Sequence, residues 1–300
     1  MRRQARRTIV LLPLLLVLLL VPRALGEVSV DDPAGAHPSW LSMGLQGGED
    51  EGFPVPWEVH RRSIPGTWVL NPDGDQRGDG HPAAAFPGGA FRPVVTWSTP
   101  VDGNGRDVVI SEWTGNGWSA PETVAGGISE QRGPDIAVLP DGSLAVTWWE
   151  DDGNVRQVWV RKRSADGTWL DAEPVSPAGD DCRWPAVTVV GGNLLVGWFR
   201  ERGDGTREVV VAREEAAWAT ETIGETTYAG PDDDGNACLE LHAVGDRAWA
   251  DWRLAADRIG TSRRDASSGA WSEVDEIPCE NSPDGRRLAR WEAKQRALRP

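Results

Sequence analysis

Arginines in equivalent positions of the chain are the first candidates for ligand chemistry. Arg132 and Arg183 each stand two residues before a proline and lie 51 residues apart, and Arg77 occupies a similar Gly- and Asp-rich segment. A guanidinium presents a planar fork of donors that matches a carboxylate. If the fold brings the three together, with Asp181 beside them, they would bind an acidic ligand. The alternative is that they pair with acids such as Glu130 and only order their loops.

Carboxylates form the second group of candidates, because glycoside cleavage depends on positioned Asp and Glu side chains. The chain holds 46 acidic residues, and no spacing separates a catalytic set from solvated surface charge. The available side chains include Asp79, Asp135, Asp181, Glu240 and Asp251.

The positions of the tryptophans indicate the structural repeat that must place these groups. Two series of this residue run through the chain in step, each with a period of about 50 residues. The first series follows Gly-rich turns, and the second ends short apolar runs. The first series is Trp68, Trp118, Trp169, Trp218 and Trp271, and the second is Trp97, Trp148, Trp198 and Trp252.

Four short apolar segments per repeat, split by Gly and Asp and without a helical period, predict an all-β fold. A four-stranded unit of this length is one blade of a β-propeller, and five blades account for the chain. A half blade at 57–80 would be completed by a closing strand at 284–292, or alternatively by strands within 27–56. The complete blades are predicted at about 81–133, 134–184, 185–236 and 237–283, within a single domain spanning 57–300.

The repeats resemble the Trp-rich tandem repeats of secreted bacterial proteins in the sialidase-like, Asp-box type propeller superfamily. The resemblance covers residues 57–292 and rests on P-x-[VI]-x-V, then D-G-x-L-x-V-x-W, then G-x-W. It implies the fold and leaves function open. The turn from Ser164 to Trp169 is one residue shorter than the Asp-box pattern, and its other copies have lost the Asp.

The same resemblance supplies an enzymatic alternative. Sialidases use a tyrosine nucleophile, a glutamate that activates it and an aspartate acid/base, together with an arginine triad. The resemblance implies that the single tyrosine, Tyr228, would be the nucleophile here. The nearby Glu225 and Asp232 would be the activating glutamate and the acid/base. Five-bladed glycosidases instead use three separated carboxylates around the propeller axis. Sialidases normally have six blades, so the predicted count of five weakens the sialidase reading.

The tryptophans also admit a binding role, since sugar rings stack on exposed indoles. The segment from Ile110 to Trp118 is similar to the repeat motif of fucose-binding propellers. Only this one copy matches the motif well, whereas such lectins carry it in most blades. Packing between neighbouring blades accounts for the two periodic series more simply. We therefore expect a binding module for an extracellular glycan or acidic ligand, with a sialidase-like hydrolase or a structural, protein-binding propeller as alternatives.

The N-terminal sequence indicates the compartment of the protein, and the net charge limits the class of its partners. Residues 1–26 have a basic start, an apolar run and a small-residue exit, which predict a signal peptide cleaved near Gly26, and residues 27–56 follow as a partly irregular segment. The apolar run is short for a bilayer span, so no stable membrane insertion is expected. The net charge of −15 excludes nucleic acid as a natural partner, and a secreted monomer is expected.

Cysteine and metal signals are weak. Three cysteines in an exported chain predict one disulfide and one unpaired thiol, and the sequence does not choose the pair among Cys182, Cys238 and Cys279. No metal or other cofactor is expected, because neither cysteine nor histidine shows ligand spacing. The acidic run 232–234 and the loop 71–80 could hold Ca²⁺, although neither matches the EF-hand pattern.

Overall fold

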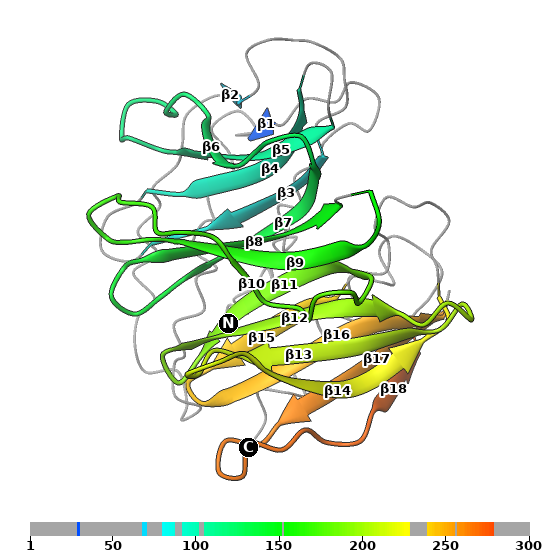
Figure 1. The fold of residues 1–300 in the computed structure, drawn as a ribbon. Coiled ribbons are helices and arrows are strands. Elements are labelled where there is room, and N and C mark those ends of the chain that lie inside the picture. The colour runs from blue at the N-terminus through cyan, green and yellow to red at the C-terminus, as the bar shows by residue number, and fades with distance from the viewer. Residues whose placement is uncertain are drawn as a thin grey trace, which may run out of the picture.

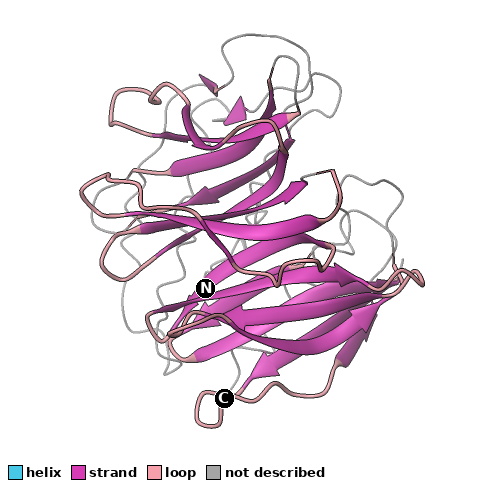
Figure 2. Cartoon of the chain, viewed as in Figure 1, coloured by secondary structure: helices cyan, strands magenta, loops and turns pink. Residues whose placement is uncertain are grey.

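The computed structural model describes residues 29–30, 68–70, 80–87, 92–101, 105–151, 153–228, 239–255 and 257–278. These residues form strands and the turns between them, as Figure 2 shows. No helix long and apolar enough to cross a membrane occurs in this part of the chain. The prediction of an all-β fold is confirmed.

Sixteen of the strands make four antiparallel sheets of four strands each, and in every sheet the strands pair in chain order (Figure 1). These sheets are the blades. The first blade contains β3 (Gly80–Ala85), β4 (Val94–Pro100), β5 (Arg106–Glu112) and β6 (Glu122–Ala125). The second contains β7 (Glu130–Val138), β8 (Leu144–Asp151), β9 (Arg156–Arg163) and β10 (Glu173–Pro174). The third contains β11 (Cys182–Val190), β12 (Asn193–Glu201), β13 (Arg207–Arg213) and β14 (Ala219–Thr226). The fourth contains β15 (Glu240–Val244), β16 (Arg247–Ala255), β17 (Arg258–Arg264) and β18 (Asp275–Pro278).

The first strands of the blades line the inside of the propeller. β7 lies between β3 and β11, and β11 contacts β15, so the four first strands stand side by side around a common axis (Figure 1). Each blade then extends outward to its fourth strand. Side chains at the beginning of the first strands consequently come close together even though they are about 50 residues apart in sequence.

The second strand of each blade is buried on both faces, which explains its continuous apolar sequence. In β8, for example, the six residues from Leu144 to Trp149 are all buried. A Gly at a tight turn precedes this strand: Gly142 has a φ of 87°, a left-handed conformation that glycine adopts without strain. The DG signal in the sequence therefore marks a real hairpin between β7 and β8.

The second tryptophan series packs between blades. Trp148 lies in a buried cluster with Val108 and Ile110 of the first blade, and Trp198 lies in a cluster with Val158 and Val160 of the second. All four members of the series are 2% exposed or less. Their role as packing residues is confirmed, and we call them the interface tryptophans: Trp97, Trp148, Trp198 and Trp252.

The outer edge of the blades carries the near-Asp-box turn. Ser164 Oγ donates a hydrogen bond of 2.5 Å to Asp166 Oδ1. Asp166 Oδ1 also accepts a hydrogen bond of 3.0 Å from the backbone N–H of Thr168. Trp169, at the end of this turn, bridges to Arg163 and donates from Nε1 to Glu122 of the first blade at 2.8 Å. This turn therefore closes a hairpin and ties two blades together far from the first strands.

The fifth blade of the prediction falls largely outside the described residues. Within the predicted half blade 57–80, the structure describes β2 (Trp68–Val69), which pairs with β1 (Ser29–Val30). This pairing corresponds to the alternative in which residues 27–56 complete the blade. The predicted closing strand 284–292 lies outside the described residues, and the blade count of five remains a prediction.

Candidate functional site

The first strands of three blades are interrupted at the same point. In β3, β7 and β11 the register with the second strand shifts across a two-residue bulge whose second residue is a proline. The residue before each proline has a positive φ: 54° at His81, 57° at Gly133 and 57° at Trp184. This conformation is free of strain for glycine but costs His and Trp about 1–3 kcal/mol. Strain of this kind persists where the surrounding structure holds the backbone in place, and such residues cluster at functional sites.

The two strained side chains, from β3 of the first blade and β11 of the third, contact each other. The rings of His81 and Trp184 have centroids 4.9 Å apart, and Trp184 meets Trp149 edge to face at 5.8 Å. Gly133 leaves the room for these rings, because a Cβ there would lie 3.1 Å from Trp149 Nε1 and 3.1 Å from Trp184 Cε3. Trp149 is buried, whereas His81 and Trp184 are partly exposed. We call His81, Trp149 and Trp184 the ring cluster.

The bulge also changes where the predicted arginines lie. Arg132 pairs with Trp149 in the β7–β8 register, and Arg183 pairs with Phe199 in the β11–β12 register. Both arginines therefore stand within first strands and not in the loops before them, and the predicted blade boundaries at 133 and 184 fall inside β7 and β11. In both strands, pairing with the second strand continues on the N-terminal side of the bulge. The proline in the sequence hides this continuation, because proline is expected to end a strand.

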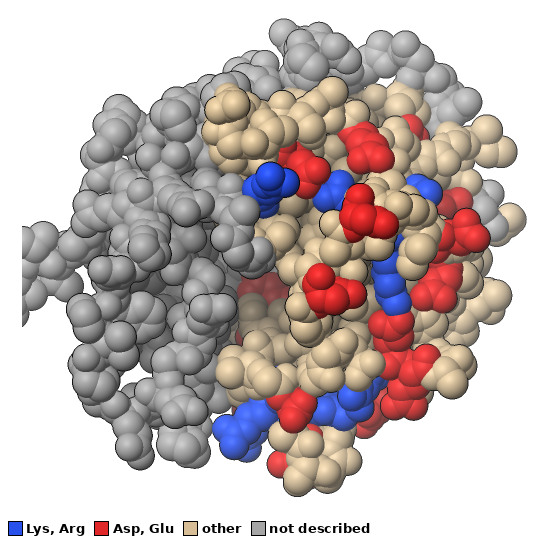
Figure 3. Space-filling view, turned by 90° about the vertical axis from the view of Figure 1, so that its left-hand side faces the viewer, with Lys and Arg blue, Asp and Glu red and all other residues tan. Residues whose placement is uncertain are grey.

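Each of these arginines is joined to a carboxylate. Arg132 Nε donates to Glu130 at 2.6 Å, and Arg183 Nε donates to Glu201 at 2.8 Å. Asp181, predicted to bind ligand, accepts from Arg156 Nη1 at 3.2 and 3.1 Å on its two oxygens. Arg132, Arg183 and Asp181 thus each have a charged partner within the protein, and Arg77 lies outside the described residues. Ligand binding by these residues stays a prediction. Figure 3 shows another face of the molecule, on which acidic and basic side chains are also intermixed.

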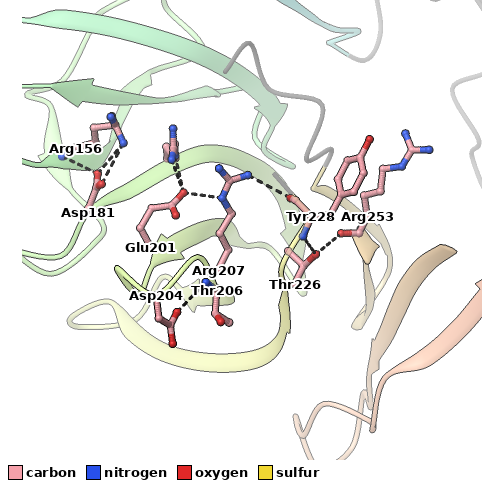
Figure 4. A network of polar contacts seen from close by, with 10 residues as sticks. Arg156, Asp181, Glu201, Asp204, Thr206, Arg207, Thr226, Tyr228 and Arg253 are labelled. Carbon is pink, nitrogen blue, oxygen red and sulfur yellow. Dashed lines mark hydrogen bonds and ion pairs between the residues drawn. The ribbon is translucent and has the colours of Figure 1, made fainter. Parts of the chain in front are cut away.

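The residues of the sialidase-like alternative are not assembled by the described contacts. Figure 4 shows Tyr228 held through its backbone: its N–H donates to Thr226 at 3.0 Å, and its carbonyl accepts from Arg207 at 3.3 Å. Its ring lies beneath the guanidinium of Arg253, 5.0 Å from the ring centroid. Among the described residues, no carboxylate hydrogen-bonds to its hydroxyl. Glu225 is exposed on β14, the outermost strand of its blade, and Asp232 lies outside the described residues.

Three of the five candidate carboxylates lie close to the axis, and we call Asp135, Glu240 and Asp251 the axial acids. Asp135 pairs with Thr147 in the second blade as Glu240 pairs with Asp251 in the fourth, so Asp135 and Glu240 occupy equivalent positions. His242 Nε2 lies 3.4 Å from Glu240 Oε2 and 3.5 Å from Asp251 Oδ2. Strand register, which sequence spacing alone does not reveal, brings this group together.

Asp135 differs from an ordinary surface acid. Burial raises the pKa of its carboxyl to about 6, although hydrogen bonds from the backbone N–H groups of Val187 and Ile136 act in the opposite direction. The nearby Glu240 raises this pKa further, and His242 lowers it. The bond from Val187 N is 2.7 Å long and joins β7 to β11. Asp135 therefore connects two blades and also provides a carboxyl group that titrates near neutral pH.

Metal and thiol chemistry find no support in the described part of the chain. No group of three or more His, Cys, Asp or Glu side chains there is arranged to hold a metal ion. The acidic run 232–234 and residues 71–79 of the other loop considered for Ca²⁺ lie outside the described residues. Cys182 is a free, buried thiol whose pKa is raised to about 12, mainly by burial. Cys238 and Cys279 lie outside the described residues, so the single predicted disulfide, whose pair the sequence left open, remains a prediction.

The ring cluster was missed by sequence reasoning. Trp149 and Trp184 belong to neither periodic tryptophan series, and His81 showed no paired spacing with another histidine. A signal was nevertheless present: His, Gly and Trp occupy the same position before proline in GHP, RGP and RWP. Gly133 indicated a positive φ, and by equivalence the two ring residues had to share it.

Comparison with known proteins supports the fold. The chain matches no protein-family model, and no curated protein is detectably similar in sequence. The α-L-arabinanase of Penicillium chrysogenum, solved with arabinobiose, aligns with a TM-score of 0.51 and 12% identity over 71% of this chain and 69% of its own. The Hadza microbial sialidase Hz136 aligns with a TM-score of 0.50 and 11% identity over 65% of this chain and 46% of its own. This chain thus spans about half of that sialidase. The β-propeller fold is confirmed.

Proposed function

We propose that the protein is a glycan-binding β-propeller whose ligand sits at the axial end of the first strands, on the ring cluster. The observation that carries this proposal is the pair of strained residues, His81 and Trp184, whose partly exposed rings meet at the axis. Backbone strain of about 1–3 kcal/mol per residue persists where the surrounding structure maintains it for function. An aromatic surface with a few polar groups around it is typical of small-ligand sites.

The surroundings suit a sugar. An indole offers a flat apolar face to the C–H side of a sugar ring, while Arg132 beside Trp149 and the carboxylates nearby can bond the hydroxyl groups. Together with the predicted signal peptide, this supports an extracellular glycan as the ligand. A protein ligand would need a broader surface than these three rings, and the observations favour the glycan.

Binding measurements test the proposal directly. A glycan array identifies ligands, and calorimetry then compares the wild type with Trp184→Ala. Trp218→Ala is the matched control, because Trp218 is also partly buried but lies just before β14, the outermost strand. We expect at least a tenfold loss of affinity for Trp184→Ala and none for Trp218→Ala. Equal affinities of all three proteins, or no bound glycan, would contradict the proposal.

A second function, glycoside hydrolysis, is favoured by one observation. Asp135 has a pKa of about 6 and stands near Glu240, an arrangement in which one carboxyl can donate a proton while another stays ionised. A panel of aryl glycosides that includes an arabinofuranoside and a sialoside tests this function. Release of aryl alcohol that is abolished in Asp135→Asn would support an enzyme. The sialidase-like assignment of Tyr228 draws no support from its described contacts.

A further inference from the structure

We infer that the axial end of the propeller selects a neutral sugar ring and disfavours sugars that carry a carboxylate. This inference rests on the proposed glycan-binding function and names the class of its ligand. It departs from the expectation that convergent arginines would recognise an acidic ligand. The argument depends on what those arginines already contact.

Arg132 on β7 and Arg183 on β11 each already bind a carboxylate within the protein. Arg183 faces Glu201 through both Nε and Nη2, at 2.8 and 2.6 Å. Arg132 faces Glu130 through its own Nε and Nη2 in the same manner. Each guanidinium fork therefore already holds one carboxylate, which is the group that an acidic sugar would have to replace.

Glu201 is held more firmly than a surface acid. Its Oε1 accepts hydrogen bonds from Arg183 and also from Arg207, the latter at 2.7 Å, and all three side chains are largely buried. Arg207 continues to the carbonyl of Tyr228, as Figure 4 shows. Displacing Glu201 would leave a buried charge without its partners, a costly change. A ligand carboxylate has no comparable means of replacing it.

The next pair along the same side of the molecule repeats this arrangement. Arg156, whose guanidinium lies 5.9 Å from the Trp149 ring centroid, binds both oxygens of Asp181. Of the two guanidinium groups that flank Trp149, neither therefore offers an uncompensated positive charge to a ligand.

The axial acids add negative charge at the centre. His242 lies 3.4 Å from Glu240 and 3.5 Å from Asp251, and the charges of His242 and Glu240 both act on Asp135. The whole chain carries a net charge of −15, which also repels an approaching anion. Carboxylates in such a site accept hydrogen bonds from sugar hydroxyl groups, whereas they oppose a sugar carboxylate. A neutral ring stacked on Trp184 satisfies both features.

Matched pairs of oligosaccharides test the inference. Calorimetry of the full chain would compare lactose with sialyllactose, and galactan with galacturonan oligomers, together with the best neutral ligand from the array and its uronic acid counterpart. We expect every neutral member that binds to bind at least tenfold more tightly than its acidic partner. Tighter binding of the acidic members would overturn the inference and leave the glycan-binding function intact. Binding of no glycan would overturn both.

Two variants alter the charge balance in a defined way. Glu201→Gln releases Arg183 and Arg207, and Glu130→Gln releases Arg132 at a more exposed position that is easier to change without unfolding. Either is expected to shift the preference about tenfold toward the acidic member of each pair. Glu214→Gln, which loses an ion pair with Lys162, is the matched control and should leave the preference unchanged. An unchanged preference in both folded variants would overturn the inference.

Discussion

The interface tryptophans and the ring cluster use the same kinds of side chain in opposite ways. Trp97, Trp148, Trp198 and Trp252 repeat at one position of every described blade and are almost completely buried. At the pre-proline position of the first strands, in contrast, the residue differs in each blade: His81, Gly133 and Trp184. A position that repeats serves the packing that all blades share. The position that varies among equivalent blades is the one at which we propose that the ligand binds.

The largest expected effect breaks the repeating side of this comparison. Trp198 has 0% exposure in the cluster between the second and third blades, so Trp198→Ala leaves a large cavity. Substitutions of this kind lower the free energy of unfolding by about 3–5 kcal/mol. Urea unfolding followed by circular dichroism measures the loss, with the partly exposed Trp218→Ala as control. A loss below that of the control would show that the interface tryptophans do not dominate packing.

A smaller effect is expected where the varying position is a glycine. Gly133→Ala introduces strain at a φ of 57° and also places a Cβ 3.1 Å from both Trp149 and Trp184. Gly153→Ala has a φ of 90° with no atom nearby, so it measures strain alone. We expect Gly153→Ala to cost about 1–2 kcal/mol, and Gly133→Ala to cost about 1–3 kcal/mol more because of crowding.

Glycan affinity distinguishes the two glycine variants more sharply than stability does. Gly133→Ala should displace the Trp184 ring and weaken binding at least tenfold, whereas Gly153→Ala, in the β8–β9 turn, should bind as the wild type does. Equal affinity of the two folded variants would show that the ring cluster is only a packing feature. The comparison between buried and axial tryptophans would then lose its functional meaning.

The same contrast explains how much could be predicted from the sequence. The four-stranded blades and the role of Trp148 or Trp198 followed from spacing, because each blade must bury one large side chain against its neighbour and turn at a glycine. Arg132 and Arg183 were placed in loops because a proline conceals that pairing continues before the bulge. Glu130 was named beforehand as a possible arginine partner, whereas Glu201 was not, since a chain rich in acids offers many partners.

Asp135 shows the limit of prediction from another side. It was one of five candidate carboxylates with nothing to separate it from the others, and Asp79 among them lies outside the described residues. Its position opposite Thr147, equivalent to Glu240 opposite Asp251, depends on strand register. Its contact with Val187 depends on which two blades are neighbours. Neither property is encoded in local spacing, so the axial acids emerge only in the folded chain.

Asp135 also gives a pH-dependent prediction. Its pKa is raised to about 6 in the folded protein from an ordinary value near 3.8, mainly by burial, so the folded state binds more protons than the unfolded state between these values. Stability should therefore fall as pH rises from 4 to 6, by up to about 1.4 kcal/mol per unit of pH. In Asp135→Asn this contribution is absent. Urea unfolding of both proteins at pH 4, 5, 6 and 7 measures the difference.

The expected outcome is that the free energy of unfolding of the wild type, relative to Asp135→Asn, decreases between pH 4 and 6 and is constant above pH 7. Glycan affinity of both proteins, measured over the same pH range, shows separately whether Asp135 contacts the ligand. A constant difference across the range would mean that Asp135 is ionised in the folded state at all these pH values. Asp135 would then titrate as an ordinary carboxylate.

The smallest effect is expected at the outer edge, where an aspartate behaves in the opposite sense. Hydrogen bonds from Ser164 and Thr168 hold the pKa of Asp166 below its ordinary value. Its contribution to stability is therefore present above the unfolded pKa and is lost as pH falls through the folded one. Asp166→Asn should destabilise the protein slightly at neutral pH and not at all in strong acid, with unchanged glycan affinity. Weakened glycan binding in this variant would place function at the outer hairpins and contradict the assignment to the axis.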